Sequence, residues 1–227
     1  MTVAGAAGDR WATFDCYGTL IDWDRGVRDT LADVWPEEDA ERLFHRYHDV
    51  EPRIQATARG VPYRRVLRET LEAIAAEDEL EIPPGREDAL VEALPSWRPF
   101  PEVPGALAEL RERGWRLAML SNTDPDLLDA SLERIGVPVD LRVTAAEAGS
   151  YKPAFGHWDT FFRRSSADRE RHVHVGASRY HDVEPCAQLG LPCVWINRLD
   201  ESSDLPRAGE LPSLAGLPGT LDALVPG

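Results

Sequence analysis

The chain contains few cysteines and no long hydrophobic run. Its 227 residues include three cysteines, an odd number, and all of them lie in apolar stretches, namely Cys16, Cys186 and Cys193. We therefore expect reduced thiols and a cytoplasmic location rather than a disulfide framework. No apolar run approaches the length of a membrane span, and no signal peptide opens the sequence. These features predict no membrane partner.

Basic residues are also scarce. The sequence holds 25 Lys and Arg against 40 Asp and Glu, which gives a formal net charge of −15. This charge would repel phosphates, so a nucleic-acid partner is disfavoured. The acidic residues are spread over helix-like segments such as 36–41, which is typical of a solvated surface. The length and a hydrophobic content of 43% suit one α/β domain or a core with a small insert.

Short apolar runs alternate with helix-like segments over most of the chain. They predict strands at residues 11–14, 115–121, 139–144, 172–176 and 193–197. Helices are expected between them, beginning near Pro104 and at Asp124-Pro125, where Asp124 would cap its helix. The order βαβαβ predicts a parallel sheet with right-handed crossovers. Residues 199–227, rich in Pro, Gly, Ser and Leu, are expected to form an irregular tail packed on the core.

The stretch from residue 24 to 98 has a different pattern. Apolar residues recur there at helical spacing in four segments, and no strand is expected. Asp24 is expected to cap the first of these helices. The stretch therefore predicts an all-helical insert within the α/β core.

Four segments place polar side chains near the ends of predicted strands. Asp15 follows the strand at 11–14, while Ser121 and Asn122 stand at the end of the strand at 115–121. Lys152 precedes a proline in an extended turn, and Asp182 follows the strand at 172–176. Because open α/β sheets build their sites at the carboxyl ends of strands, these residues are candidates for one site.

Each candidate has a chemical role and a simpler alternative. A desolvated carboxylate such as Asp15 is a competent nucleophile, and a nearby Lys152 would keep it ionised and oriented. Ser121 and Asn122, just before a helix N-terminus, would form an anion cradle. The alternatives are a turn aspartate, a surface lysine, an ordinary helix cap and, for Asp182, a second helix cap.

Together these segments resemble the four motifs of the haloacid dehalogenase superfamily. The match is carried by residues 14–20 (FDCYGTL), 120–122 (LSN), 151–153 (YKP) and 195–198 (WINR). Tyr17 stands where phosphatases of the superfamily carry a second Asp, so the chain is similar to the type II 2-haloacid dehalogenase-like branch. The resemblance implies a Rossmann-like parallel sheet core, residues 1–23 and 99–227, with an inserted all-helical cap domain, residues 24–98.

The resemblance also implies a hydrolase that cleaves the carbon–halogen bond of a small 2-haloalkanoic acid through an aspartyl-ester intermediate. Asp15 would be the nucleophile, with Lys152 stabilising it and Thr19 hydrogen-bonded near it. Asp182 would position or deprotonate the water that attacks the ester. The implied partner is a small-molecule carboxylate substrate.

The substrate side of the site is implied in the same way. Ser121 and the backbone of Asn122 would hold the substrate carboxylate. A cap arginine would receive the halide, and Arg53 is the best placed by sequence, with Arg46 and Arg59 as competitors. Three more residues are assigned to substrate binding: Tyr17, Trp158 and Ser178.

No metal or other cofactor is expected. Tyr17 and Ala177 replace two acids that would bind magnesium, which leaves a poor site for a hard cation. His172 and His174 alternate on one strand face, but no third ligand accompanies them. Characterised dehalogenases carry Ser and Asn where this chain has Ala177 and Arg179. Another hydrolase of the branch acting on a small activated acid, a phosphatase and a non-catalytic relative therefore stay open, as does a homodimer.

Overall fold

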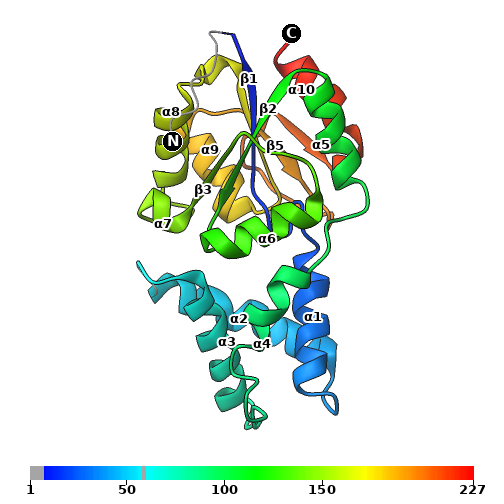
Figure 1. The fold of residues 1–227 in the computed structure, drawn as a ribbon, viewed down its shortest axis with the longest axis vertical. Helices are drawn as coiled ribbons and strands as arrows, with labels where there is room; N and C mark the ends of the chain where they lie inside the picture. Colours follow the sequence, from blue (N-terminus) through cyan, green and yellow to red (C-terminus); the bar gives the residue numbers. More distant parts are fainter. Residues whose placement is uncertain (1–7, 58–59) are drawn as a thin grey trace.

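Six parallel strands form one sheet in the order β3-β2-β1-β4-β5-β6. The computed structural model describes residues 8–57 and 60–227. Its strands are β1 (Arg10–Phe14), β2 (Trp115–Ser121), β3 (Leu141–Thr144), β4 (His172–Gly176), β5 (Cys193–Ile196) and β6 (Gly209–Leu211). The core helices are α5 (Val103–Glu112), α6 (Pro125–Ile135), α7 (Ala145–Ala148), α8 (Gly156–Ser165), α9 (Glu184–Leu189) and α10 (Leu217–Leu224). This arrangement confirms the predicted α/β fold (Figure 1).

The central strands are buried because helices cover both faces of the sheet. All five residues of β1 are buried. Trp11 packs on the α8 side, where its ring centroid lies 5.4 Å from that of Phe161. Ala12 and Phe14 belong to the other hydrophobic cluster, which includes residues of α5, α6 and α10. Alternate residues of β1 therefore supply two separate cores, one on each face.

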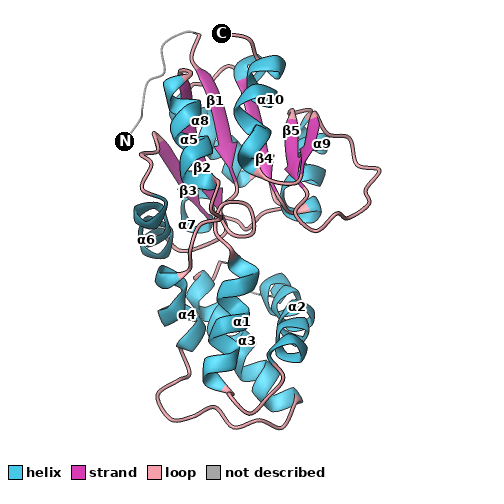
Figure 2. Ribbon diagram, turned by 90° about the vertical axis from the view of Figure 1, so that its right-hand side faces the viewer, coloured by secondary structure: helices cyan, strands magenta, loops and turns pink. Residues whose placement is uncertain are grey.

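Four helices form a separate group at the edge of the sheet where β1 ends (Figures 1 and 2). They are α1 (Trp23–Val34), α2 (Ala40–Thr57), α3 (Tyr63–Glu77) and α4 (Ala89–Ala93). Their apolar faces pack on one another, with Leu31, Leu43, Leu67 and Leu71 fully buried. This group is the predicted helical cap.

Helix α1 begins at Trp23, one residue before Asp24, which was expected to be its N-cap. The Asp22 carboxylate accepts the backbone N–H of Arg25 at 3.3 Å, so Asp22 and not Asp24 caps α1. The prediction of Asp24 as the cap is wrong. Asp24 lies in the first turn, where a carboxylate is favoured by the helix dipole, and it lines the cavity described below.

Asp124 joins the core to the cap. It precedes α6 as expected, but its side chain makes no cap hydrogen bond to that helix. Its carboxylate instead accepts the backbone N–H groups of Tyr63 and Arg64, the first residues of α3, at 2.9 and 3.0 Å. Nearby, the Tyr151 hydroxyl donates to the Val61 carbonyl at 2.6 Å. A core side chain thus caps the N-terminus of a cap helix.

The end of the chain is more regular than expected. Strand β6 pairs with β5, and α10 buries Leu217 and Leu221. The expectation of an irregular tail is therefore wrong for these two elements. A strand of three residues is too short to produce a periodic pattern, and tertiary packing rather than propensity stabilises a helix as short as α10.

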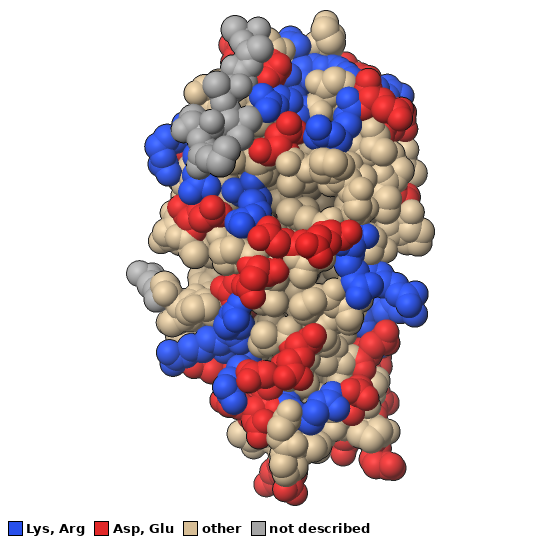
Figure 3. Space-filling view, in the orientation of Figure 1, with Lys and Arg blue, Asp and Glu red and all other residues tan. Residues whose placement is uncertain are grey.

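Charged side chains of both signs are interspersed on the face shown in Figure 3, and acidic ones lie along the junction of core and cap. Many of the basic side chains are ion-paired, for example Arg113 with Asp222 at 2.7 Å. Over residues 8–57 and 60–227, no helix has both the length and the apolar character needed to cross a membrane.

Candidate active site

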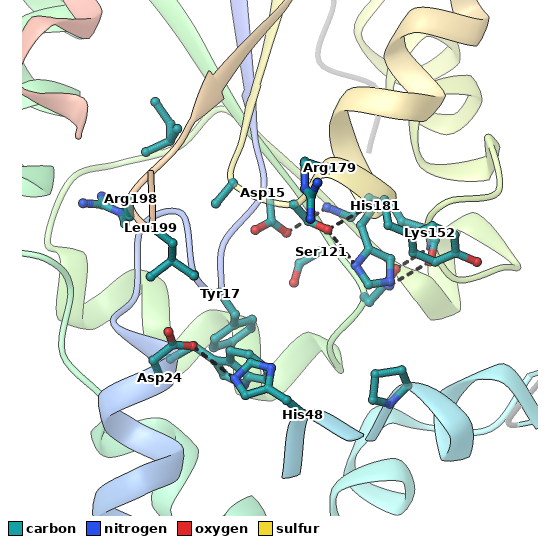
Figure 4. Close-up of a pocket in the computed structure, with 18 of the residues that line it drawn as sticks. Asp15, Tyr17, Asp24, His48, Ser121, Lys152, Arg179, His181, Arg198 and Leu199 are labelled. Atoms are coloured by element: carbon teal, nitrogen blue, oxygen red, sulfur yellow. Dashed lines mark hydrogen bonds and ion pairs between the residues drawn. The ribbon is translucent and has the colours of Figure 1, made fainter. Parts of the chain in front are cut away.

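A cavity of about 780 Å³ is lined by both the carboxyl ends of the strands and the cap. Figure 4 shows Asp15 and Ser121 on one side of this space and Asp24 and His48 on the other. The core contributes, among others, Asp15, Tyr17, Ser121, Asn122, Lys152 and His181. The cap contributes, among others, Trp23, Asp24, His48, Glu51, Gln55 and Tyr63.

Asp15 directly follows β1 and is held at both carboxylate oxygens. Thr19 Oγ1 donates to Oδ2 at 2.8 Å, and Lys152 Nζ donates to Oδ1 at 2.8 Å. Thr19 Oγ1 also accepts the backbone N–H of Ala177 at 2.9 Å, and Arg198 donates to the Thr19 carbonyl at 2.8 Å. These bonds brace the turn after β1 and fix one orientation of the carboxylate at the cavity.

Lys152 is the only lysine of the sequence, and it is almost completely buried. Its ammonium group lies 2.8 Å from Asp15 Oδ1 and 2.7 Å from Asp182 Oδ1. Burial by itself lowers the pKa of Lys152, but the two carboxylates outweigh burial and raise it above its usual range. Asn122 fixes the backbone here, because its Oδ1 accepts the Lys152 N–H at 2.6 Å. The structure thus brings the predicted Asp15, Lys152 and Asp182 together.

Asp182 is buried away from the cavity. It is fully buried and is not one of the described residues that line the cavity. Besides Lys152, its carboxylate contacts the Ser178 N–H at 3.2 Å and His174 Nε2 at 3.2 Å. Burial acts to raise the pKa of Asp182, but Lys152 and His174 outweigh it and hold this pKa well below its usual range. Such a carboxylate is a weak base and does not line the cavity, which disagrees with its expected role of positioning or deprotonating water. Its contact is with Lys152 instead.

The electrostatics of Asp15 differ from those of Asp182. Burial raises the pKa of Asp15, Lys152 opposes this, and repulsion from Asp182 adds to it, with a net upward shift. The physical reason is that one lysine charge is shared between two carboxylates. Asp15 is consequently more basic than an exposed aspartate, which suits a nucleophile.

Four of the residues assigned to substrate binding reach the cavity, namely Tyr17, Ser121, Asn122 and Ser178. Ser121 is the last residue of β2, and the Tyr17 hydroxyl is hydrogen-bonded to Ser131 Oγ at 2.9 Å. Ser178 accepts the His181 backbone N–H at 3.0 Å, so Ser178 and not Asp182 caps the turn that follows β4.

Trp158 does not reach the cavity, and its assignment to substrate binding is wrong. It is 1% exposed and packs edge-on against His174, with ring centroids 5.2 Å apart. The reason is the orientation of α8, whose apolar face covers the sheet and so turns Trp158 into the core between them.

Arg53 points away from the cavity, which overturns its assignment as the halide receiver. Its guanidinium pairs with Glu77 at 2.9 Å, and its side chain is 58% exposed. Arg46 pairs with Glu77 and Asp78 on the same outer face, at 2.7 and 2.9 Å. At about 100° per residue, Arg53 lies about 200° around α2 from Glu51, which does line the cavity. The remaining competitor, Arg59, lies outside the described residues.

Sequence reasoning missed a hydrogen-bonded chain that connects cap and core at the cavity wall. Tyr63 Oη and Gln55 Nε2 both donate to Glu51 Oε1, at 3.3 and 3.1 Å. Gln55 Oε1 lies 3.2 Å from His181 Nε2, and His181 Nδ1 lies 3.2 Å from Ser178 Oγ. One signal in the sequence could have indicated this hydrogen-bonded chain. Glu51 follows Tyr47 by four positions, which places a charged residue on the apolar face of a predicted helix.

The two histidines of β4 are part of the core. Thr13 Oγ1 lies 2.8 Å from His172 Nε2 and 2.8 Å from His174 Nδ1. Among the residues that the structure describes, no group of three or more His, Cys, Asp or Glu side chains is placed to hold a metal ion. Their contacts place both histidines in the core, and His174 alone also contacts Asp182.

The fold and the site define a class of protein, an α/β enzyme with a buried carboxylate–lysine pair under a helical cap. A family model described as haloacid dehalogenase-like hydrolase matches residues 10–190, and the chain belongs to that family. It is similar to the (S)-2-haloacid dehalogenase of Pseudomonas sp. (strain YL), with 25% identity over 197 residues, or 82% of this chain and 81% of that protein.

Two further similarities are to a phosphatase and to a solved structure. The phosphoserine phosphatase of Thermus thermophilus is 31% identical over 166 residues, which cover 70% of this chain and 64% of that protein. The structure of L-2-haloacid dehalogenase from Xanthobacter autotrophicus with chloropropionic acid covalently bound has a TM-score of 0.82 at 19% identity. That similarity covers 93% of this chain and 97% of that one, and it establishes a shared fold.

Proposed function

We propose that this protein is a 2-haloacid dehalogenase that hydrolyses the carbon–halogen bond of a small 2-haloalkanoic acid without a metal ion. The observation that carries the proposal is the Asp15 carboxylate, held at the cavity by Thr19 and Lys152. The similarity to an (S)-2-haloacid dehalogenase, and to a dehalogenase with chloropropionic acid covalently bound, supports the same chemistry.

In the first step, an oxygen of Asp15 attacks C2 of the acid. A C–O bond forms, the C–halogen bond breaks, and the halide leaves with the bonding electron pair. Lys152 keeps the attacking carboxylate ionised, and the bond from Thr19 limits its rotation, so the attack needs little reorganisation. Ser121 and Asn122 hold the substrate carboxylate next to the N-terminus of α6, where backbone N–H groups favour an anion.

In the second step, water attacks the carbonyl carbon of the Asp15 ester. The C–O bond between that carbon and the product breaks, the product oxygen takes one proton of the water to give a 2-hydroxy acid, and the other proton is released as the Asp15 carboxylate is restored. Lys152 stabilises the negative oxygen that forms on the aspartyl group, because it is the donor already at 2.8 Å from Oδ1. Asp182 acts through Lys152 by holding its ammonium group in this position.

A single-turnover reaction in H₂¹⁸O tests this scheme. One heavy oxygen should enter the peptide that contains Asp15 and none should enter the first product molecule, because water attacks the aspartyl carbon. Asp15→Asn should fold normally and lose halide release by about 10⁴-fold or more. Asp159→Asn, an exposed change on α8, is the matched control and should keep full activity. Label in the product of a single turnover would refute the ester mechanism.

Phosphatase activity is the second candidate, because a phosphoserine phosphatase is among the relatives. Tyr17 and Ala177 argue against it, since acids that would bind magnesium are missing at both positions. Phosphate release from small phosphomonoesters with Mg²⁺, in the absence of any halide release, would decide for this alternative. The small carboxylate substrate, the homodimer and the cytoplasmic location remain predictions beside the proposed function.

A further inference from the structure

The described part of the cap wall does not supply the cation expected to receive a halide. Among the described cap residues that line the cavity, none is Lys or Arg. The core arginines at the cavity are already paired, Arg179 with Glu201 at 2.9 Å and Arg198 with Glu102 at 2.8 Å. Within the described residues, a leaving group that moves away from Asp15 toward the cap therefore needs another kind of donor.

Glu51 has the geometry of such a donor. It lies on α2, lines the same cavity as Asp15, and is 6% exposed. Both of its hydrogen bonds, from Tyr63 Oη and Gln55 Nε2, go to Oε1. Among the described residues no hydrogen bond is made to Oε2, so a proton on Oε2 would be available to a group in the cavity.

The surroundings favour the neutral acid. Burial raises the pKa of Glu51 to about 7, and the hydrogen bonds from Tyr63 and Gln55 oppose this only in part.

The titratable groups that face Glu51 are Tyr47 on α2, Tyr63 on α3, and Tyr151 and His181 from the core. Burial also lowers the pKa of His181 to about 4, so none of these groups is a cation near neutral pH. Lys152, on the core side, is committed to Asp15 and Asp182.

We propose that Glu51 is the general acid for the leaving group, and that the site is built for 2-fluoro acids. As Asp15 forms its bond to C2, the C–F bond breaks, the fluorine takes the electron pair, and the Oε2 proton of Glu51 passes to it. Hydrogen fluoride leaves, Glu51 becomes a carboxylate, and ester hydrolysis returns a proton to it. Fluoride is a far better proton acceptor than chloride or bromide, so an acid helps it most. The inference rests on the proposed function and deepens it.

A leaving-group series tests this assignment. Initial rates of halide release are measured for 2-fluoro-, 2-chloro- and 2-bromopropionate with wild type and Glu51→Gln. Gln keeps the size and the acceptor oxygen of Glu but has no acidic proton. Fluoride release should fall by about 100-fold or more, the usual contribution of general acid catalysis, whereas bromide release should change less than about fivefold. Arg53→Gln, on the outer face of α2, is the matched control and should leave all three rates unchanged.

The wild-type pH profile gives a second measurement that needs no variant. Fluoride release should decline above about pH 7 as Glu51 loses its proton, while bromide release should not. Equal losses for all three halides in Glu51→Gln, or release of chloride without fluoride by wild type, would overturn the inference and leave the proposed function standing. A wild type that releases no halide would overturn both. Arg59→Gln completes the set, because a loss confined to that variant would assign the donor to Arg59 and overturn the role of Glu51.

Discussion

Glu51→Gln should change how the stability of the protein depends on pH. The pKa of Glu51 is raised from 4.5 to about 7 in the folded chain, because the carboxylate would be buried without a cation. Between these pH values the folded chain keeps a proton that the unfolded chain has lost. The stabilisation by Glu51 is therefore fully present below pH 4.5 and is lost as the pH rises through 7. At about 1.4 kcal/mol for each pH unit between the two pKa values, ionisation costs the folded state about 3 kcal/mol.

The glutamine variant removes this cost and keeps the acceptor for Tyr63 and Gln55. Relative to wild type, its gain in unfolding free energy should grow from under about 1 kcal/mol at pH 5 to about 3 kcal/mol at pH 8.5. For a chain of this size, that gain corresponds to a midpoint about 6–12 °C higher in thermal unfolding at pH 8.5.

Urea denaturation followed by tryptophan fluorescence at several pH values measures the difference directly. Glu92→Gln, an exposed change on α4, serves as the control and should give a difference that does not vary with pH. A constant difference between wild type and Glu51→Gln from pH 5 to 8.5 would refute the argument, since it would mean that Glu51 ionises equally in the folded and unfolded chains.

Three further outcomes are expected. Lys152→Met should slow ester formation by about 100-fold or more and lower the unfolding free energy by about 3–5 kcal/mol, because two buried carboxylates lose their cation. Rapid-quench kinetics measure the rate and urea titration the stability. A stable, active variant would contradict the role of Lys152. Halide release should survive excess EDTA, because Tyr17 and Ala177 leave a poor magnesium site; loss with EDTA and recovery with Mg²⁺ would indicate phosphoryl chemistry instead. Asp124→Ala should lower the unfolding free energy by about 1–2 kcal/mol and speed amide hydrogen exchange at the start of α3. Unchanged exchange there would argue against the bond between core and cap.

The elements that the sequence predicts well are those set by local pattern and by parallel topology. Apolar runs mark the central strands, and the carboxyl ends of parallel strands must meet at one edge. Asp15, Ser121 and Lys152 could therefore be placed in one site before any contact was known. The same reasoning finds the cap, because helical spacing persists where strands are absent.

The parts that escaped prediction depend on how a helix is rotated against its neighbours. Arg53 and Glu51 are two residues apart, and only the packing of α2 on the core decides which of them meets the cavity. The assignment of Trp158 to substrate binding is wrong for the same reason, because the apolar face of α8 covers the sheet. Asp182 illustrates a different limit, because its position along the chain does not reveal whether a buried lysine stands between it and the substrate.

The bond from Asp124 to α3 means that access to the cavity has an energetic threshold. Separating the cap from the core at this point leaves two N–H groups at the start of α3 without their acceptor. At about 2 kcal/mol for such a cap, this contact alone would hold the separated state to a few per cent of the molecules at rest, and the bonds of Tyr151 and Gln55 across the junction would lower it further. Substrate entry would then draw on a minor population. Asp124 is not among the described residues that line the cavity. A change there would alter the rates of substrate binding and product release without altering the chemical steps.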